Sequence, residues 1–155
     1  RRDEVLGLNG YLGHLAACLE LARRRSHRVL GLVTGQAASG SALALAFMAD
    51  EVHALEGARP WVMDLAAMSR VTKIPAARLE ELSRGSPVLA PGLESYERLG
   101  AIASVWRAPL AQALDAALAR PAAPDDRARL GLSRGGRRLA AGVADRVARV
   151  HGDAT

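Results

Sequence analysis

Apolar residues recur every three or four positions in the first part of the chain. From Asp3 to about Arg25, the spacing of leucines, valine and alanines predicts one amphipathic helix with Asp3 as its N-cap. Gly7, Gly10 and Gly13 lie three residues apart within it. Each glycine costs a helix interior about 1 kcal/mol relative to alanine, so this spacing indicates close approach of another backbone or of a ligand. Helix packing is the preferred interpretation.

The pattern then changes from helical to extended. RVLGLVT at 28–34 is apolar on both faces, as expected for a buried parallel strand. A run of small residues, GQAASGSALA at 35–44, leads into a helix, and two short strands follow as a pair, EVHALEG at 51–57 and RPWVM at 59–63. This order of elements predicts a layered α/β fold.

The second half of the chain is predicted to be mainly helical. Helices are expected near Asp64, over PAARLEELSRGS at 75–86, over APLAQALDAALARP at 108–121 and over the basic segment GGRRLAAGVADRVARV at 135–150. SPVLAPG at 86–92 is predicted to break the chain, and PAAPDD at 121–126 to be a linker. We therefore expect a domain over 1–120 and a basic tail over 121–155.

Composition narrows the class of protein. The chain has 155 residues, of which 50% are hydrophobic but only 3% aromatic, which favours helices. No apolar run approaches the roughly 18 to 20 residues of a membrane span, and RRDEV at the start has no apolar run after it, unlike a secretory signal. Without a Met there, we expect processing or a missing upstream part. The single Cys18 excludes an intramolecular disulfide and a Cys-rich zinc site, which fits a reducing cytoplasm.

The formal net charge of +5 raises the question of nucleic acid binding. The arginines concentrate at 23–25 and at 125–150, where no aromatic residues are interleaved to stack on bases. Solvated basic faces are therefore the preferred interpretation. The functional alternative is an anionic ligand or an acidic partner that docks nearby.

The small-residue run at 35–44 has two interpretations of equal weight. A helix that begins directly after a strand presents unpaired backbone N–H groups, and small side chains let a ligand approach them. If the ligand develops an oxyanion or enolate, these groups can stabilise its charge. Alternatively, the small residues only allow the helix to pack tightly on the sheet.

Other chemistries fit the sequence less well. The run lacks the Gly-Lys-Ser/Thr of a phosphate-binding loop, and Ser39 lacks the flanking glycines of a nucleophile elbow. Asp50 and Glu51 are adjacent, so on a strand they would point to opposite faces. The remaining candidates are assigned structural roles: scattered histidines that do not suit a metal site (His14, His27, His53 and His151) and two tryptophans as core or interface anchors (Trp61 and Trp106).

Several blocks of sequence, taken in order, resemble one family. GQAASGSALA, MADEVHAL and WVMDLAAMSRVTKIP are similar to the gamma subunits of malonate decarboxylases, which belong to the crotonase-like carboxyltransferase superfamily. RRDEVLGLNGYLGHLAACLELARRRSHRVLGLV and LEELSRGSPVLAPGLESYERLGAI also resemble these subunits. The resemblance covers about residues 1–107, and none of it is evident after Arg120.

The resemblance implies a crotonase-like α/β fold of repeated strand-strand-helix units, here lacking its N-terminal part. It also implies a partner, a beta subunit of related fold, with which such subunits convert malonyl-S-acyl carrier protein to acetyl-S-acyl carrier protein in the cytoplasm. The substrate is carried on the phosphopantetheine-like arm of the acyl carrier protein. No metal or cofactor is expected to bind to this chain directly.

The resemblance also assigns roles within the turn. Related carboxyltransferase subunits carry a GEGGSGGALA-like version of it, which places Gly40 and Ser41 where two backbone amides form an oxyanion hole. Ser41 replaces a glycine but keeps its backbone amide. The expected substrate-binding residues are Gly35, Gln36, Ala37, Ala38 and Ser39.

Two alternatives remain open. Acyl-CoA hydratases and isomerases of the same superfamily place a carboxylate beside the turn, and Asp64 is the nearest candidate, although its position favours an N-cap. The other alternative is a noncatalytic subunit whose turn is inactive and whose helices only support the beta chain.

Overall fold

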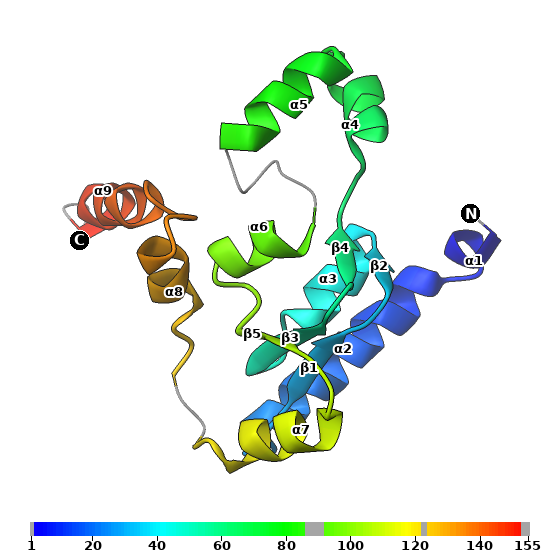
Figure 1. The fold of residues 1–155 in the computed structure, drawn as a ribbon, viewed down its shortest axis with the longest axis vertical. Coiled ribbons are helices and arrows are strands. Elements are labelled where there is room, and N and C mark those ends of the chain that lie inside the picture. The colour runs from blue at the N-terminus through cyan, green and yellow to red at the C-terminus, as the bar shows by residue number, and fades with distance from the viewer. Residues whose placement is uncertain (1, 86–91, 122–123, 153–155) are drawn as a thin grey trace.

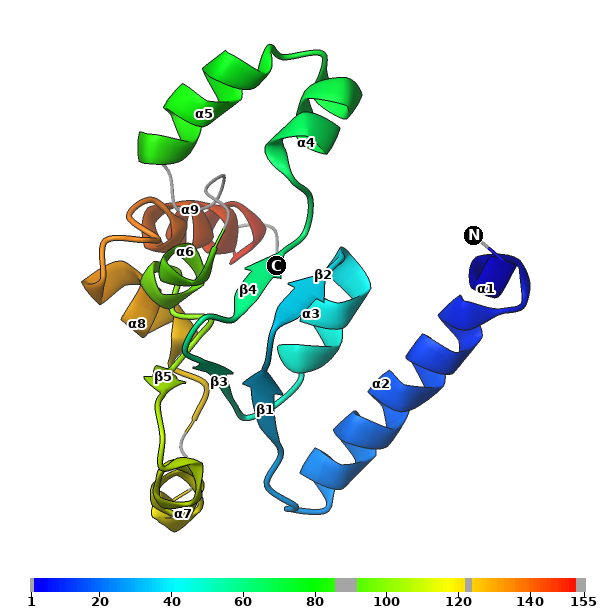
Figure 2. The ribbon, with the colours of Figure 1, turned by 45° about the vertical axis from the view of Figure 1, so that its right-hand side comes forward.

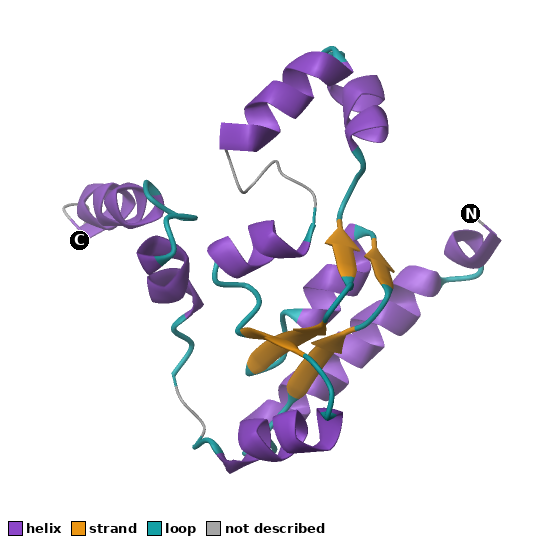
Figure 3. Ribbon diagram, viewed as in Figure 1, coloured by secondary structure: helices purple, strands orange, loops and turns teal. Residues whose placement is uncertain are grey.

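The strands of the protein lie in the middle of the molecule, with helices on several sides (Figures 1 and 3). The computed structural model describes residues 2–85, 92–121 and 124–152. In chain order, the first half contains α1 (Arg2–Val5), α2 (Leu8–Arg24), β1 (Leu30–Val33), β2 (Gln36–Ala38), α3 (Gly40–Ala46), β3 (Glu51–Leu55) and β4 (Arg59–Trp61). The second half contains α4 (Leu65–Thr72), α5 (Ala76–Gly85), α6 (Leu93–Arg98), β5 (Ser104–Trp106), α7 (Leu110–Ala119), α8 (Arg127–Ser133) and α9 (Ala140–Gly152).

All described strand pairs are parallel and form two small sheets. One sheet has the order β1-β3-β5, and the other pairs β2 with β4. The first strand of each β-β-α segment therefore enters one sheet and the second strand enters the other. The segments β1-β2-α3 and β3-β4-α4 are two successive strand-strand-helix units. The α/β prediction is confirmed at this level.

The two strands predicted as a pair, β3 and β4, do not pair with each other. β3 lies between β1 and β5, with Val52, His53 and Ala54 buried, so its two edges are already occupied. The chain turns at Gly57, which has a φ of +80°, and β4 leaves to join β2 in the second sheet. The strands themselves were predicted correctly, but their pairing was wrong.

The predicted first helix is interrupted near its start. Gly7 has a φ of +93°, a left-handed conformation that glycine tolerates, and it separates α1 from α2. Asp3 lies inside α1 and therefore does not cap the long helix. A Cβ atom built at Gly7, Gly10 or Gly13 meets nothing within 4 Å. Close packing on these glycines is thus not found within the described part of the chain.

The core is small and lies between β1, β3 and the segment before β5. Its buried side chains are Val33, Ala49, Val52, Ala54, Ala58 and Ile102. Gly31 in β1 lets α3 approach closely, because a Cβ there would lie 3.2 Å from the carbonyl oxygen of Ala46. The expectation that β1 is buried on both faces holds only in part, since Leu32 remains 42% exposed.

Glycines join α8 to the segment between α6 and β5. A Cβ at Gly100 would lie 2.3 Å from the carbonyl oxygen of Arg127, and one at Gly131 would lie 2.4 Å from that of Leu99. Arg134 adds hydrogen bonds, since its Nη1 donates to the carbonyl oxygen of Ile102 at 2.9 Å. α8 is therefore held against the strand-bearing part, and the boundary expected at residue 120 stays a prediction.

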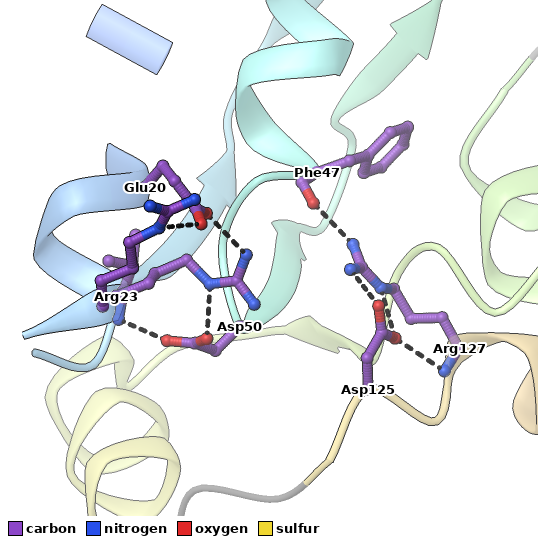
Figure 4. A network of polar contacts seen from close by, with 8 residues as sticks. Glu20, Arg23, Phe47, Asp50, Asp125 and Arg127 are labelled. Carbon is purple, nitrogen blue, oxygen red and sulfur yellow. Dashed lines mark hydrogen bonds and ion pairs between the residues drawn. The ribbon is translucent and has the colours of Figure 1, made fainter. Parts of the chain in front are cut away.

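Two ion-pair clusters flank the chain that leaves α3 (Figure 4). Asp50 accepts from Arg23 Nε at 2.9 Å and from the backbone N–H of Val29 at 2.8 Å. On the other side, Arg127 pairs with Asp125 and donates to the carbonyl oxygen of Phe47 at 2.7 Å. The hydrogen bond from Arg127 lowers the pKa of Asp125 to about 2. These contacts fix α2 and the start of α8 around one loop.

Other helices extend away from the sheets. α4 and α5 project from the strands in both ribbon views (Figures 1 and 2). The predicted break at 86–92 lies almost wholly outside the described residues, as does part of the linker at 121–126. Among the described helices, none is long and apolar enough to cross a membrane.

Candidate functional site

The turn between β2 and α3 holds a strained serine. Ser39 has φ and ψ of 88° and 153°, a region used almost only by glycine, which costs on the order of 1 to 3 kcal/mol. Its N–H donates to the carbonyl oxygen of Trp61 at 3.0 Å, so the end of β4 holds it in place. Strain of this kind is concentrated at functional sites. This strain could not be predicted from the sequence, because the small residues around Ser39 only indicated a turn.

The first two amides of α3 follow directly after this serine. α3 begins at Gly40, and the backbone N–H groups of Gly40 and Ser41 donate to no described residue. Both residues are exposed. A Cβ at Gly40 would meet only Val62 Cγ1, at 3.9 Å. A ligand can therefore approach both amides beside the apolar side chain of Val62.

The residues expected to bind substrate lie together before these amides. Gln36, Ala37 and Ala38 form β2, which pairs with Arg59, Pro60 and Trp61 of β4. Gly35 precedes β2 with a φ of +54°. The predicted turn is thus a short strand followed by a tight turn. Gln36 and Ala38 are exposed, whereas Ala37 is partly buried and packs against the core.

Among the described residues, Ser39 has no partner that would make it a nucleophile. Its Oγ lies 3.0 Å from Ser41 Oγ, and no described histidine or carboxylate contacts it. Within the described ranges, no three histidine, cysteine, aspartate or glutamate side chains gather as a metal site would require. The chemistry that the turn offers is therefore that of backbone amides.

Asp64 acts as a helix cap. Its Oδ1 accepts from the N–H of Ala67 at 2.6 Å, and α4 begins at the next residue. The N-cap position expected for Asp64 is confirmed, and the absence of a general-base role stays a prediction.

Replacing Asp64 separates the two roles in solution. Asparagine caps helices as well as aspartate does, so Asp64→Asn is expected to leave turnover and stability unchanged, whereas Asp64→Ala should cost about 1 kcal/mol of unfolding free energy. Turnover and denaturant unfolding of both variants provide the check. A loss of about a hundredfold in turnover for Asp64→Asn alone would assign the carboxylate to catalysis.

A buried histidine occupies the centre of the larger sheet. His53 is 0% exposed, stacks on Trp106 with ring centroids 4.6 Å apart, and its Nδ1 lies 3.0 Å from Ser104 Oγ. Its Nε2 lies 3.2 Å from Glu51 Oε2, and Glu51 also pairs with Arg28 and Arg120. The structural role predicted for His53 is confirmed.

Burial makes this histidine sensitive to acid. Desolvation lowers the pKa of His53 below 6.5, against the opposing attraction of Glu51. Below about pH 6.5 the unfolded chain binds a proton that folded His53 does not. The unfolding free energy should therefore decrease as the pH is lowered, by at most about 1.4 kcal/mol per pH unit. His53→Gln should flatten this dependence in denaturant titrations. The exposed His27→Gln is the control, and equal flattening there would contradict the assignment.

A cavity of about 310 Å³ lies between the start of β3 and α8. Its charged lining is balanced, with four arginines and four carboxylates: Arg28, Arg120, Arg127, Arg134, Asp50, Glu51, Asp125 and Asp126. Because these charges largely neutralise one another, the cavity does not favour an anion or a cation. Sequence reasoning missed it because its residues are far apart in the chain.

The sequence matches one known family over nearly its whole length. The family described as the malonate decarboxylase gamma subunit matches residues 1–151, so the likeness extends beyond the 1–107 expected from sequence blocks. A relative from Malonomonas rubra, the malonyl-S-ACP:biotin-protein carboxyltransferase MADD, is 33% identical over 105 residues. That match covers 66% of this chain and 36% of the relative.

Solved structures of related proteins have a fold similar to that of this chain. The chain is similar to one in a Pseudomonas malonate decarboxylase hetero-tetramer in complex with coenzyme A, with a TM-score of 0.69 and 28% identity over 100% of this chain and 63% of that one. It is also similar to a chain of a Pseudomonas MdcD-MdcE hetero-dimer, with a TM-score of 0.65 and 29% identity over 97% of this chain and 61% of that one. This chain therefore spans less than two thirds of each.

Proposed function

We propose that this chain, which belongs to the malonate decarboxylase gamma subunit family, acts with a beta subunit to decarboxylate malonyl-S-acyl carrier protein to acetyl-S-acyl carrier protein. The observation that carries the proposal is the turn at Ser39, where a strained backbone precedes two exposed amides with no described acceptor. The proposal includes a crotonase-like form of the fold, which the two successive strand-strand-helix units support.

The mechanism follows from the charge that decarboxylation creates. When the bond between the α carbon and the carboxylate breaks, carbon dioxide leaves, and the electron pair remains as an enolate with its charge mainly on the thioester oxygen. The N–H groups of Gly40 and Ser41 would donate to this oxygen, and one such donor contributes about 3 kcal/mol. The α carbon then takes up one proton to give the acetyl thioester.

The exposure of the turn supports the need for a partner. Amide donors stabilise an enolate best in a site from which water is excluded. Here Gly40 and Ser41 are exposed, and the neighbouring Val62 is 57% exposed. A second protein surface would close the site over Val62, which is the role we assign to the beta subunit. The solved Pseudomonas hetero-dimer shows that a related chain pairs with another subunit.

The substrate requirements also follow from the turn. A thioester on a long flexible arm can reach an exposed amide pair at the edge of a sheet, so the phosphopantetheine-like arm of the carrier protein suits this site. The proposed chemistry needs no metal or cofactor held by this chain. We place the complex in the cytoplasm, where the exposed thiol of Cys18 would stay reduced.

The test is carbon dioxide release from malonyl-loaded carrier protein by the full-length subunit with its beta subunit. We expect release that requires both subunits. The Malonomonas relative transfers carboxyl groups to a biotin protein, so the assay is repeated with avidin. Release that persists in avidin supports direct decarboxylation. Release that avidin abolishes assigns a biotin acceptor instead, and turnover of free acyl-CoA by this subunit alone would favour a hydratase or isomerase.

A further inference from the structure

The last helix, α9, is exposed over most of its described length. Every residue from 141 to 150 is exposed, and no other helix or strand of the described ranges packs extensively on α9. In Figure 1 it lies at the edge of the molecule, on the opposite side from the N-terminus. A helix of 13 residues is marginal in water unless a face of it is packed. α9 therefore has a face that another molecule can cover.

That face is a narrow apolar stripe. Leu139, Val143, Val147 and Val150 follow at intervals of four, four and three residues, which places them on one side of a helix. Leu139 is 80% exposed and Val150 71% exposed. Four aliphatic side chains make a small patch, smaller than the surface that permanent subunits usually bury. The stripe suits a partner that binds and leaves.

Arginines accompany the stripe. Arg146 lies three residues after Val143 and four before Val150, so it borders the stripe, and Arg149 lies one turn further on the same flank. Arg137 and Arg138 precede the helix. None of these four forms an ion pair with a described residue, and Arg149 Nε donates only to the carbonyl oxygen of Asp145, at 3.2 Å. The positive charge here is available to a partner.

The charge and composition of α9 indicate which kind of partner would bind to its exposed face. A second copy of the chain would place Arg146 against its own counterpart, because that residue lies near the middle of the stripe. A membrane surface is disfavoured because membrane-bound helices usually insert aromatic residues, and no aromatic residue follows Trp106. Nucleic acid would use the arginines but leave the stripe uncovered. The surface fits an acidic protein with a short apolar groove.

We propose that α9 is the docking helix for the acyl carrier protein, whose docking surface would then need an acidic rim around an apolar groove. This inference rests on the proposed function, which requires the carrier to arrive and leave in every turnover. Charged groups at the rim of an interface speed association more than they raise affinity, as such a cycle needs. The stripe of α9 enters the groove, and Arg146 and Arg149 pair with carboxylates at its rim.

The experiment measures binding of fluorescently labelled carrier protein to the complex of full-length subunit and beta subunit. Arg146→Glu with Arg149→Glu is expected to weaken binding at least about tenfold at low ionic strength, and less in high salt. Val147→Asp tests the apolar stripe by itself: it leaves the arginines in place and should also weaken carrier binding. The matched control is Arg25→Glu with Arg70→Glu, two exposed arginines outside α9 that give the same change in net charge.

Each possible result supports or overturns the proposal that the carrier protein docks on α9. A tenfold loss for the α9 variants against less than about twofold for the control supports it, as does a raised KM for malonyl-loaded carrier with kcat unchanged. Equal losses in both double variants would show a nonspecific charge effect and overturn it. Loss of the beta subunit from the α9 variants, with carrier binding intact, would reassign the helix. Binding is read without turnover, so a failure of the proposed reaction is seen separately, as absent carbon dioxide release in the wild type.

Discussion

Replacing Gly40 with valine is expected to lower carbon dioxide release from malonyl-loaded carrier at least about a hundredfold, the effect of losing an oxyanion donor. A side chain at this position would stand over the amides of Gly40 and Ser41 and keep the thioester oxygen away. The backbone tolerates the change, because Gly40 has no positive φ and a Cβ there makes only an ordinary contact with Val62, at 3.9 Å.

The matched control for Gly40 is Ala44→Val. Ala44 is an exposed residue of the same helix, one turn further from the amides. It should keep wild-type turnover. Co-purification with the beta subunit shows whether each variant still assembles. Wild-type turnover by an assembled Gly40→Val complex would mean that the turn serves packing alone, and the chain would then be a supporting subunit.

Replacing Gly100 with alanine is expected to lower the unfolding free energy by about 2 to 4 kcal/mol. Gly100 has a φ of +77°, which costs other residues about 1 kcal/mol or more. A Cβ would also lie 2.3 Å from the carbonyl oxygen of Arg127 and 2.6 Å from the nitrogen of Gly131, both backbone atoms. α8 would have to move away, and overpacking of this kind costs about 1 to 3 kcal/mol.

Denaturant unfolding, followed by tryptophan fluorescence, measures this change. Gly13→Ala is the control, because Gly13 lies inside α2 and a Cβ there meets nothing within 4 Å. It should raise stability by about 0.5 to 1 kcal/mol. If both variants shifted stability in the same direction and amount, the close contact between α8 and the turn at Gly100 would not hold in solution.

Sequence patterns predicted the longer elements of the fold. The periodic segments became α2, α7 and α9, and the apolar runs became β1 and β3. The helix predictions succeeded because apolar residues recur every three or four positions over ten or more residues, a period that distinguishes a helix from a strand. The pattern missed β2, α6, β5 and α8, of which β2 and β5 have only three residues each. Three residues are too few to show a period.

The sequence located the candidate turn but not its geometry. Small residues between a strand and a helix indicated amides that a ligand can approach, and Gly40 is indeed at the start of α3. The positive φ of Ser39 could not be predicted, since serine seldom adopts it without support. That support is the carbonyl oxygen of Trp61, at the end of a strand in the other strand-strand-helix unit. The oxyanion role of the amides stays a prediction.

By itself, the sequence determined the family of this chain, the order of its main helices and strands, and the place of the turn. These properties are carried by local spacing and by blocks of neighbouring residues. Only the tertiary structure decided that β3 joins β1 and β5 while β4 joins β2, that Gly100 and Gly131 bring α8 against the turn before β5, and that α9 is left exposed. Such pairings depend on which surfaces meet after the chain folds, and residues distant in sequence carry no local sign of that.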